Sequence, residues 1–155
     1  MLKIRKGKKE DLPHILKLIK ELASYENATN QVDITLKELE IDGFGEKPFY
    51  NFLVAEKNTQ IIGMSFYFIR YSTWKGKLLF LEDFIVTKKY RHIGVGKELF
   101  DATIKICQKL NLNGMCWQIL DWNNPAIEFY KKYKSEISSD WLNGRLTKKQ
   151  IHNLV

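Results

Sequence analysis

The residues best suited to chemistry lie together in the middle of the chain. An apolar stretch at 79–86 contains the adjacent carboxylates Glu82 and Asp83, and the turn RHIGVG follows at 91–96. The residues after this turn have the apolar spacing of a helix. Glycines in such a turn let an anionic group approach the backbone, and N–H groups at the start of a helix bind phosphate oxygens. A strand with carboxylates followed by this turn indicates a site that joins an anionic cofactor to a substrate.

The glycine spacing of the turn excludes two common phosphate-binding motifs. No Gly-Lys-Ser/Thr follows, so the turn is not a P-loop, and its spacing differs from the dinucleotide-binding fingerprint. The Arg91 guanidinium can add a charge-assisted hydrogen bond to a pyrophosphate. A glycine turn on its own is often only structural. Here a strand pattern precedes it and a periodic helix follows it, which favours a role in binding.

The two adjacent carboxylates pose a question of geometry. Neighbouring side chains of a regular strand point to opposite faces of the sheet. Glu82 and Asp83 can therefore serve one site only if a β-bulge intervenes. We expect one of them to act in the site and the other to be a structural or supporting residue.

The elements that must position these residues follow from hydrophobic periodicity. The expected strands are 2–5, 52–56, 61–69, 77–86 and 115–120, and the expected helices are 10–23, 35–43, 95–110 and 123–133. The weaker pattern beyond Lys134 leaves room for one or two terminal strands. This order predicts one α/β domain, residues 1–155, with a mixed sheet that is antiparallel first and parallel later.

The composition bounds the class of protein. With 45% hydrophobic and 13% aromatic residues, the chain is expected to form a packed core. It has no signal-peptide pattern and no apolar run of bilayer length, so we expect a cytoplasmic protein without a membrane partner. The cysteines and histidines lack the spacing of metal ligands, so no metal is expected. The net charge of +7 favours anionic partners, but the lysine pairs are dispersed, which disfavours nucleic acid.

The turn with its flanking strand and helix resembles the acetyl-CoA loop, Arg/Gln-x-x-Gly-x-Gly/Ala, of the GNAT superfamily of N-acetyltransferases. Further segments narrow the resemblance to the diamine (spermidine/spermine) acetyltransferase branch, over about residues 2 to 133. These segments are LIKELA at 18–23, Tyr25-Glu26, DGFGE at 42–46, LVAE at 53–56, LEDF at 81–84, Trp122-Asn123 and FYK at 129–131. The chain departs from the branch after Tyr130, since Lys134 stands where the branch commonly has glycine.

The resemblance implies a GNAT-type mixed, partly antiparallel sheet, flanked by helices and with splayed central strands. It also implies transfer of the acetyl group of acetyl-CoA to a primary amine, expected to be a polyamine such as spermidine or spermine. The transfer would be direct, in a ternary complex. Glu82 would deprotonate the amine and Tyr130 would protonate the departing thiolate. A homodimer is implied as well.

The remaining site residues are also implied by the resemblance, and they fall into two groups. The cofactor group comprises Phe84, Ile85, Val86, Arg91, His92, Ile93, Gly94, Val95, Gly96, Lys97, Asn123, Asn124, Pro125, Ala126 and Lys131. The substrate group comprises Tyr25, Glu26, Glu82, Cys116, Trp117 and Gln118.

Other functions stay open at this point. The acceptor can instead be thialysine, another lysine-like small molecule, or an amine of a protein or peptide. A non-catalytic CoA-binding regulator belongs to a different class, and the presence of Glu82 and Tyr130 argues against it. A polycationic substrate also conflicts with the net charge of +7 unless carboxylates gather locally at the site.

Overall fold

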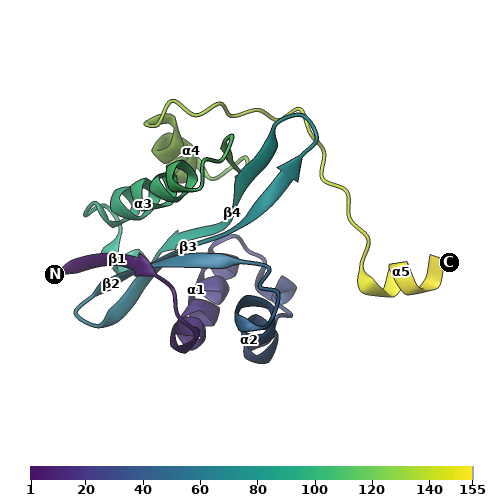
Figure 1. The fold of residues 1–155 in the computed structure, drawn as a ribbon, viewed down its shortest axis with the longest axis horizontal. Coiled ribbons are helices and arrows are strands. Elements are labelled where there is room, and N and C mark those ends of the chain that lie inside the picture. The colour runs from purple at the N-terminus through teal and green to yellow at the C-terminus, as the bar shows by residue number, and fades with distance from the viewer. Residues whose placement is uncertain (155) are drawn as a thin grey trace. The chain divides into compact units, whose positions relative to one another are not determined.

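The computed structural model describes residues 1–154, and its first 118 residues contain a five-stranded sheet (Figure 1). The strands lie side by side in chain order: β1 (Leu2–Lys6), β2 (Asn51–Lys57), β3 (Gln60–Ser72), β4 (Gly76–Val86) and β5 (Met115–Trp117). Neighbouring strands from β1 to β4 are antiparallel, and β5 is parallel to β4. The predicted change from antiparallel to parallel pairing is confirmed.

Helices cover both faces of this sheet. The helices α1 (Leu12–Tyr25) and α2 (Leu36–Phe44) lie against one face, and α3 (Val95–Lys109) lies against the other (Figure 1). Short 3-10 helices, η1 (Lys9–Asp11), η2 (Thr29–Gln31) and η3 (Lys88–Tyr90), connect them. The helix α1 forms because its apolar residues recur on one face, from which Leu12, Ile15 and Leu18 enter the core. Thr35 and Glu38 form a reciprocal capping box that starts α2.

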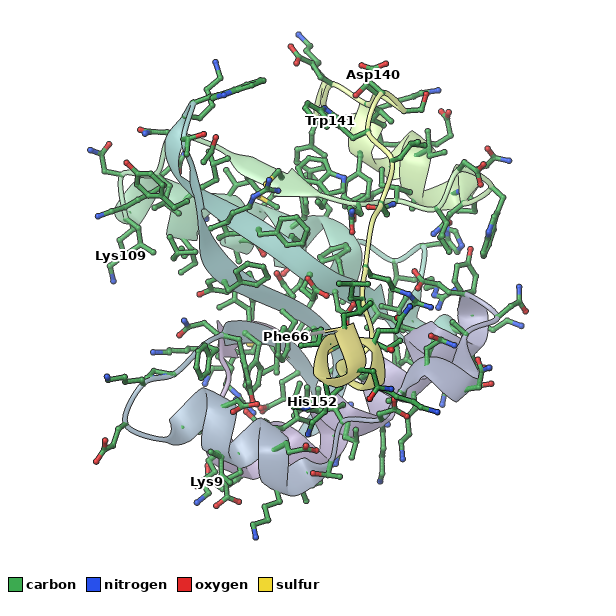
Figure 2. All side chains as sticks on the ribbon, turned by 90° about the vertical axis from the view of Figure 1, so that its right-hand side faces the viewer. Lys9, Phe66, Lys109, Asp140, Trp141 and His152 are labelled. Atoms are coloured by element: carbon green, nitrogen blue, oxygen red, sulfur yellow. The ribbon has the colours of Figure 1, made fainter. Side chains whose placement is uncertain are left out.

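The two faces of the sheet have different cores. On the α1 and α2 face, the ring of Phe66, which Figure 2 labels, stacks on Tyr50 at a centroid distance of 4.3 Å and packs against the core. On the α3 face, the hydroxyl groups of Ser65 and Thr103 are 2.7 Å apart, and Thr103 Oγ1 donates to Leu99 O. Side chains of β3 therefore alternate between the two cores, as strand geometry requires.

The described chain divides into two compact units, and this sheet with its helices makes up the first, Met1–Gln118. The second begins at Ile119 and contains α4 (Asn124–Lys131) and α5 (Lys148–Leu154). Within residues 1–154, no helix combines the length and apolar character that crossing a bilayer requires. That the whole chain is one acetyltransferase domain stays a prediction.

Two strand predictions near the C-terminus are wrong. The strand expected at 115–120 ends at Trp117, and no terminal strand follows Lys134 within the described residues. Extended residues form a strand only where another strand pairs with their N–H and C=O groups. The end of the described chain is instead helical, because Thr147 and Gln150 cap the start of α5.

Candidate active site

A β-bulge in β4 decides where the two adjacent carboxylates point. Asp83 is opposite Phe66 on β3, and Leu81 is opposite the next residue, Tyr67. Glu82 is therefore an extra residue without a partner in the register. Such a bulge bends the strand locally and re-aims side chains. The condition under which both carboxylates can serve one site is thus met.

The aromatic residues around the bulge show which face of the sheet each side chain of β4 occupies. Phe80 stacks on Phe68 at 5.1 Å, and Asp83 pairs with Phe66, which lies on the same face of β3 as Phe68. Phe80 and Asp83 consequently share the α1 and α2 face although three positions separate them, which a regular strand does not allow. Phe84 returns to the other face, where its ring is 5.6 Å from that of Phe100 on α3. We call the side with Phe80 and Asp83 the carboxylate face.

Two further carboxylates act on Asp83, which lies on this face. Burial, together with the charges of Glu82 and Glu26, raises the pKa of Asp83 to about 6. Glu26 directly follows α1, and burial raises its pKa as well. The sequence selected Glu26 and Glu82 and left Asp83 open, and the structure adds Asp83 to the group. A cationic amine would offset the repulsion that Glu82 and Glu26 exert on the charged form of Asp83.

The backbone of β4 alternates in the direction of its hydrogen-bonding groups. Leu79 N donates to Gly114 O on the β5 side, whereas Thr87 N donates to Ile62 O at the start of β3. Because these directions alternate along a strand, the backbone N–H and C=O groups of Ile85 point to β3, like those of Thr87. The backbone groups of Phe84 and Val86 point to the β5 side. The pairing of β5 with β4 ends at Leu81, so Phe84 and Val86 lie beyond it. An extended cofactor arm can run along this side of the strand as an added strand would.

The turn before α3 has the geometry of an anion site. His92 and Gly94 both have positive φ angles, of 64° and 91°. No heavy atom lies within 4 Å of the position that a Cβ on Gly94 would occupy, so the backbone is open to approach. The first bond of α3 runs from Glu98 N to Gly94 O, at 3.1 Å. The amides at 95–97 come before that bond, in the first turn, where helices bind phosphate. The residues present therefore fit the pyrophosphate of a CoA-type cofactor.

The side chain of Arg91 points toward α1 and not along the turn. Its Nε donates to Val86 O at 2.8 Å, and its guanidinium carbon is 5.1 Å from the ring centroid of Tyr25. Glu21, one turn before Tyr25 on α1, accepts from Thr87 Oγ1 at 2.8 Å and from Lys88 N at 3.1 Å. We call this set of contacts the α1 clamp. It ties the predicted cofactor turn to the helix end that carries the predicted substrate residues.

Glu21 was not selected from the sequence. A glutamate at a polar position of an amphipathic helix carries no local signal for a long-range contact. The one available hint was its position four residues before Tyr25, which places both side chains on one helix face.

The strand β5 separates two of the predicted substrate residues. Cys116 is in register with Phe80 and so lies on the carboxylate face. Trp117 packs edge-on against Phe100 of α3, with ring centroids 5.7 Å apart, and faces the other side. Burial raises the pKa of the Cys116 thiol, and the charge and hydrogen bond of Arg70 oppose that rise. Gln118 follows the strand and ends the first unit.

The remaining predicted residues belong to the second unit and are described within it. The Oδ1 of Asn123 accepts from Ala126 N at the start of α4, whose first turn also contains Asn124 and Pro125. Tyr130 is buried, and this burial raises the pKa of its phenol above the ordinary value. Its ring is 5.3 Å from that of Phe129, and its carbonyl accepts from Ser135 Oγ. Lys131 forms an exposed ion pair with Glu128.

No group of three or more potential metal ligands occurs in the part of the chain that the structure describes.

Comparison with known proteins defines the class. A family model described as Acetyltransferase (GNAT) family matches residues 15–134, which is most of the chain. The chain belongs to this family, whose members use acetyl-CoA as the acetyl donor.

Among individual relatives, thialysine N-epsilon-acetyltransferase of Bos taurus is 38% identical over 136 residues, which cover 83% of this chain and 80% of that protein. Spermidine/spermine N(1)-acetyltransferase-like protein 1 of Homo sapiens is 37% identical, and the match covers 82% of this chain but 19% of that longer protein. L-ornithine N5-acetyltransferase of Arabidopsis thaliana is 28% identical, with 77% of this chain and 50% of that protein covered.

Solved structures support the fold. The aminoglycoside N-acetyltransferase AAC(6')-Iy in complex with CoA superposes with a TM-score of 0.75 at 20% identity, covering 94% of this chain and 95% of that one. A metagenomic aminoglycoside acetyltransferase in complex with sisomicin superposes with a TM-score of 0.77 at 19% identity, covering 94% of this chain and 95% of that one. The predicted GNAT-type fold class is confirmed.

Proposed function

We propose that the protein transfers the acetyl group of acetyl-CoA to the terminal primary amine of a small cationic acceptor. The observation that carries this proposal is the bulge at Glu82. It allows two consecutive residues to present carboxylates to one face, while Phe84 and Val86 direct backbone groups to the side where β5 has ended. One strand thus offers an amine site and a cofactor edge next to each other.

The proposed cofactor site uses backbone groups of the first unit. The backbone of β4 at 84–86 would bind the pantetheine arm, and the amides of the 91–97 turn would bind the pyrophosphate. When bound, acetyl-CoA supplies the thioester that an amine attacks. Asn123, Asn124, Pro125, Ala126 and Lys131 remain proposed cofactor residues on the strength of the family motif.

The proposed acceptor site prepares the amine. A primary amine with a pKa near 10 is mostly protonated at neutral pH, so it must lose a proton before it can attack. Glu82 is the proposed acceptor of that proton, through a water molecule, and Glu26 and Asp83 hold the cation beside it. A backbone N–H of β4 would stabilise the oxyanion that forms as the amine adds to the carbonyl carbon.

Tyr130 is the proposed proton donor to the departing thiolate. As the C–S bond breaks, the sulfur gains negative charge and the phenol transfers its proton to it. A phenol with an ordinary pKa of about 10 is protonated at neutral pH, and burial raises the pKa of Tyr130 further, so the group has a proton to give once negative charge develops on the sulfur. This assignment rests on the Phe129-Tyr130 pair of the family motif.

Two kinds of acceptor are supported by specific observations. A polyamine is favoured by the three carboxylates, which suit a chain with several positive charges. A lysine-like amino acid is favoured by relatives that are named for thialysine and L-ornithine. Both kinds carry the terminal primary amine that the proposed chemistry needs.

A turnover panel tests the proposal. Release of the CoA thiol is measured with spermidine, spermine, putrescine, thialysine, lysine, ornithine and lysine-containing peptides. We expect at least one small amine to be acetylated, and Glu82→Gln to lower kcat by about 100-fold or more with little change in the KM for acetyl-CoA. Binding of acetyl-CoA without turnover of any amine would instead identify a CoA-binding regulator and refute the proposal.

A further inference from the structure

A cation, Arg70, lies on the carboxylate face of the sheet. It is the residue of β3 opposite Leu78, and alternation places it on the same face as Phe66 and Phe68. Its side chain is exposed. The predicted site residues do not include it, and the mechanism proposed above does not use it.

Contacts with the two neighbouring strands hold the guanidinium of Arg70 over this face. The guanidinium carbon lies 5.8 Å from the ring centroid of Phe80 on β4. The side chain also lies close enough to Cys116 on β5, one of the predicted substrate residues, to lower the pKa of its thiol and so oppose the rise that burial causes. Stacking on an aromatic ring leaves the edge of a guanidinium available for a planar, bidentate anion such as a carboxylate.

The spacing between the guanidinium and the carboxylates matches a particular kind of molecule. On β3, which has no extra residue here, Arg70 is four residues from Phe66, the residue opposite Asp83, and four residues span about 13 Å along a strand. In lysine, six bonds join the carboxylate carbon to the terminal nitrogen, and they span roughly 7 Å when extended. A hydrogen bond of about 3 Å at each end extends this reach to roughly 13 Å. An amino acid of this length can therefore reach the guanidinium with its carboxylate and Glu82 with its amine.

The sign of the charge argues in the same direction. A polyamine is positive along its whole length, so a guanidinium beside its binding site would repel it. A lysine-like amino acid has a negative end as well as a positive one. On the carboxylate face, Arg70 can pair with the negative end of this zwitterion, and the acids Glu26, Glu82 and Asp83 can pair with its positive end.

We propose that Arg70 binds the α-carboxylate of a lysine-like amino acid whose terminal amine lies at Glu26, Glu82 and Asp83. Arg70 thereby selects amino-acid acceptors over polyamines. This inference rests on the proposed function, because it concerns the acceptor site of the same reaction.

The test combines changes in the enzyme with changes in the substrate. For Arg70→Gln, we expect the KM for thialysine and lysine to rise about 10- to 100-fold while kcat changes little, since a charge-assisted contact is lost. The KM for lysinamide, cadaverine and spermidine should stay the same or fall. Arg70→Lys keeps the positive charge but loses the bidentate guanidinium geometry, so its KM for lysine should lie between those of the wild type and Arg70→Gln. Lys77→Gln is the matched control, because it removes an exposed cation from the opposite face of the same hairpin.

Each outcome is decisive. A wild-type preference for lysine over lysinamide that Arg70→Gln abolishes supports the inference. An equal effect of Arg70→Gln on all amines, or no effect on lysine, overturns it and leaves the proposed function standing. Absence of turnover with every amine refutes the proposed function itself, and the role of Arg70 with it. If Arg70→Gln is unstable by thermal unfolding, then Arg70→Lys and the comparison of lysine with lysinamide on the wild type decide the matter.

Discussion

At the scale of single residues, Asp83 shows how the site is electrostatically strained before a ligand binds. Its carboxylate is partly buried and lies near two other acids, Glu82 and Glu26. Both effects disfavour the charged form, so the pKa is about 6 in place of the ordinary 3.8. A cationic acceptor reverses the second effect, because it attracts what the neighbouring acids repel. Binding of an amine should therefore lower the pKa of Asp83.

The stability of the protein should depend on pH through this residue. An acid whose pKa is higher in the folded state binds more protons when folded than when unfolded, between about pH 4 and 6. The free energy of unfolding therefore falls as the pH rises through this window, and the loss is complete above it. A difference of about two pKa units corresponds to at most about 3 kcal/mol.

Asp83→Asn should remove this loss. We expect the variant to be more stable than the wild type at pH 7.5, with a smaller difference at pH 4, because the amide cannot ionise. Urea unfolding at a series of pH values measures both curves. Asp140→Asn, at an exposed aspartate, serves as the control. If the free energies of unfolding of Asp83→Asn and the wild type change with pH in parallel, ionisation of Asp83 does not destabilise the protein.

At the scale of the elements, the α1 clamp connects two segments that are distant in sequence. Glu21 bonds to Thr87 and Lys88 immediately after β4, and Arg91 lies over Tyr25. The cofactor turn is thereby attached to the end of α1, where the proposed amine site begins. Because Glu21 touches neither proposed ligand, we regard it as a positioning residue.

Glu21→Gln tests this connection. The amide can still accept from Thr87, but it loses the negative charge that attracts Lys88 N and Arg91. We expect the KM for acetyl-CoA to rise about 3- to 10-fold, with a smaller change in kcat, since loss of one partly exposed charge-assisted contact is modest. Isothermal titration with CoA gives the affinity directly. Glu40→Gln, which breaks the exposed ion pair with Lys9, should leave CoA binding unchanged. Equal effects of the two substitutions would indicate a general loss of charge and not a clamp.

At the scale of the whole molecule, the sequence predicted most elements but not their register. The apolar faces of the helices and the β2–β3 hairpin follow from local hydrophobic periodicity, which can be read directly from the sequence. The bulge at Glu82 was not predictable, because it depends on how two strands align and not on either strand alone. The strand expected to reach Leu120 stops at Trp117 because pairing, which periodicity does not report, ends there. The direction of the Arg91 side chain likewise depends on α1, whose residues lie far away in sequence.

The second unit supplies the last prediction, because it carries the proposed acid. Tyr130 and Tyr133 lie on the same stretch of chain, and both rings contact Phe129, at 5.3 and 5.6 Å. Removing either phenolic oxygen leaves the ring and its packing in place. Tyr130→Phe should lower kcat by about 100-fold or more and leave the affinity for CoA unchanged, because the proton is needed only as the thiolate departs. Tyr133→Phe is the matched control and should keep its kcat. Steady-state turnover and CoA titration of both variants decide the assignment. A fully active Tyr130→Phe enzyme would require another proton source for the leaving thiol.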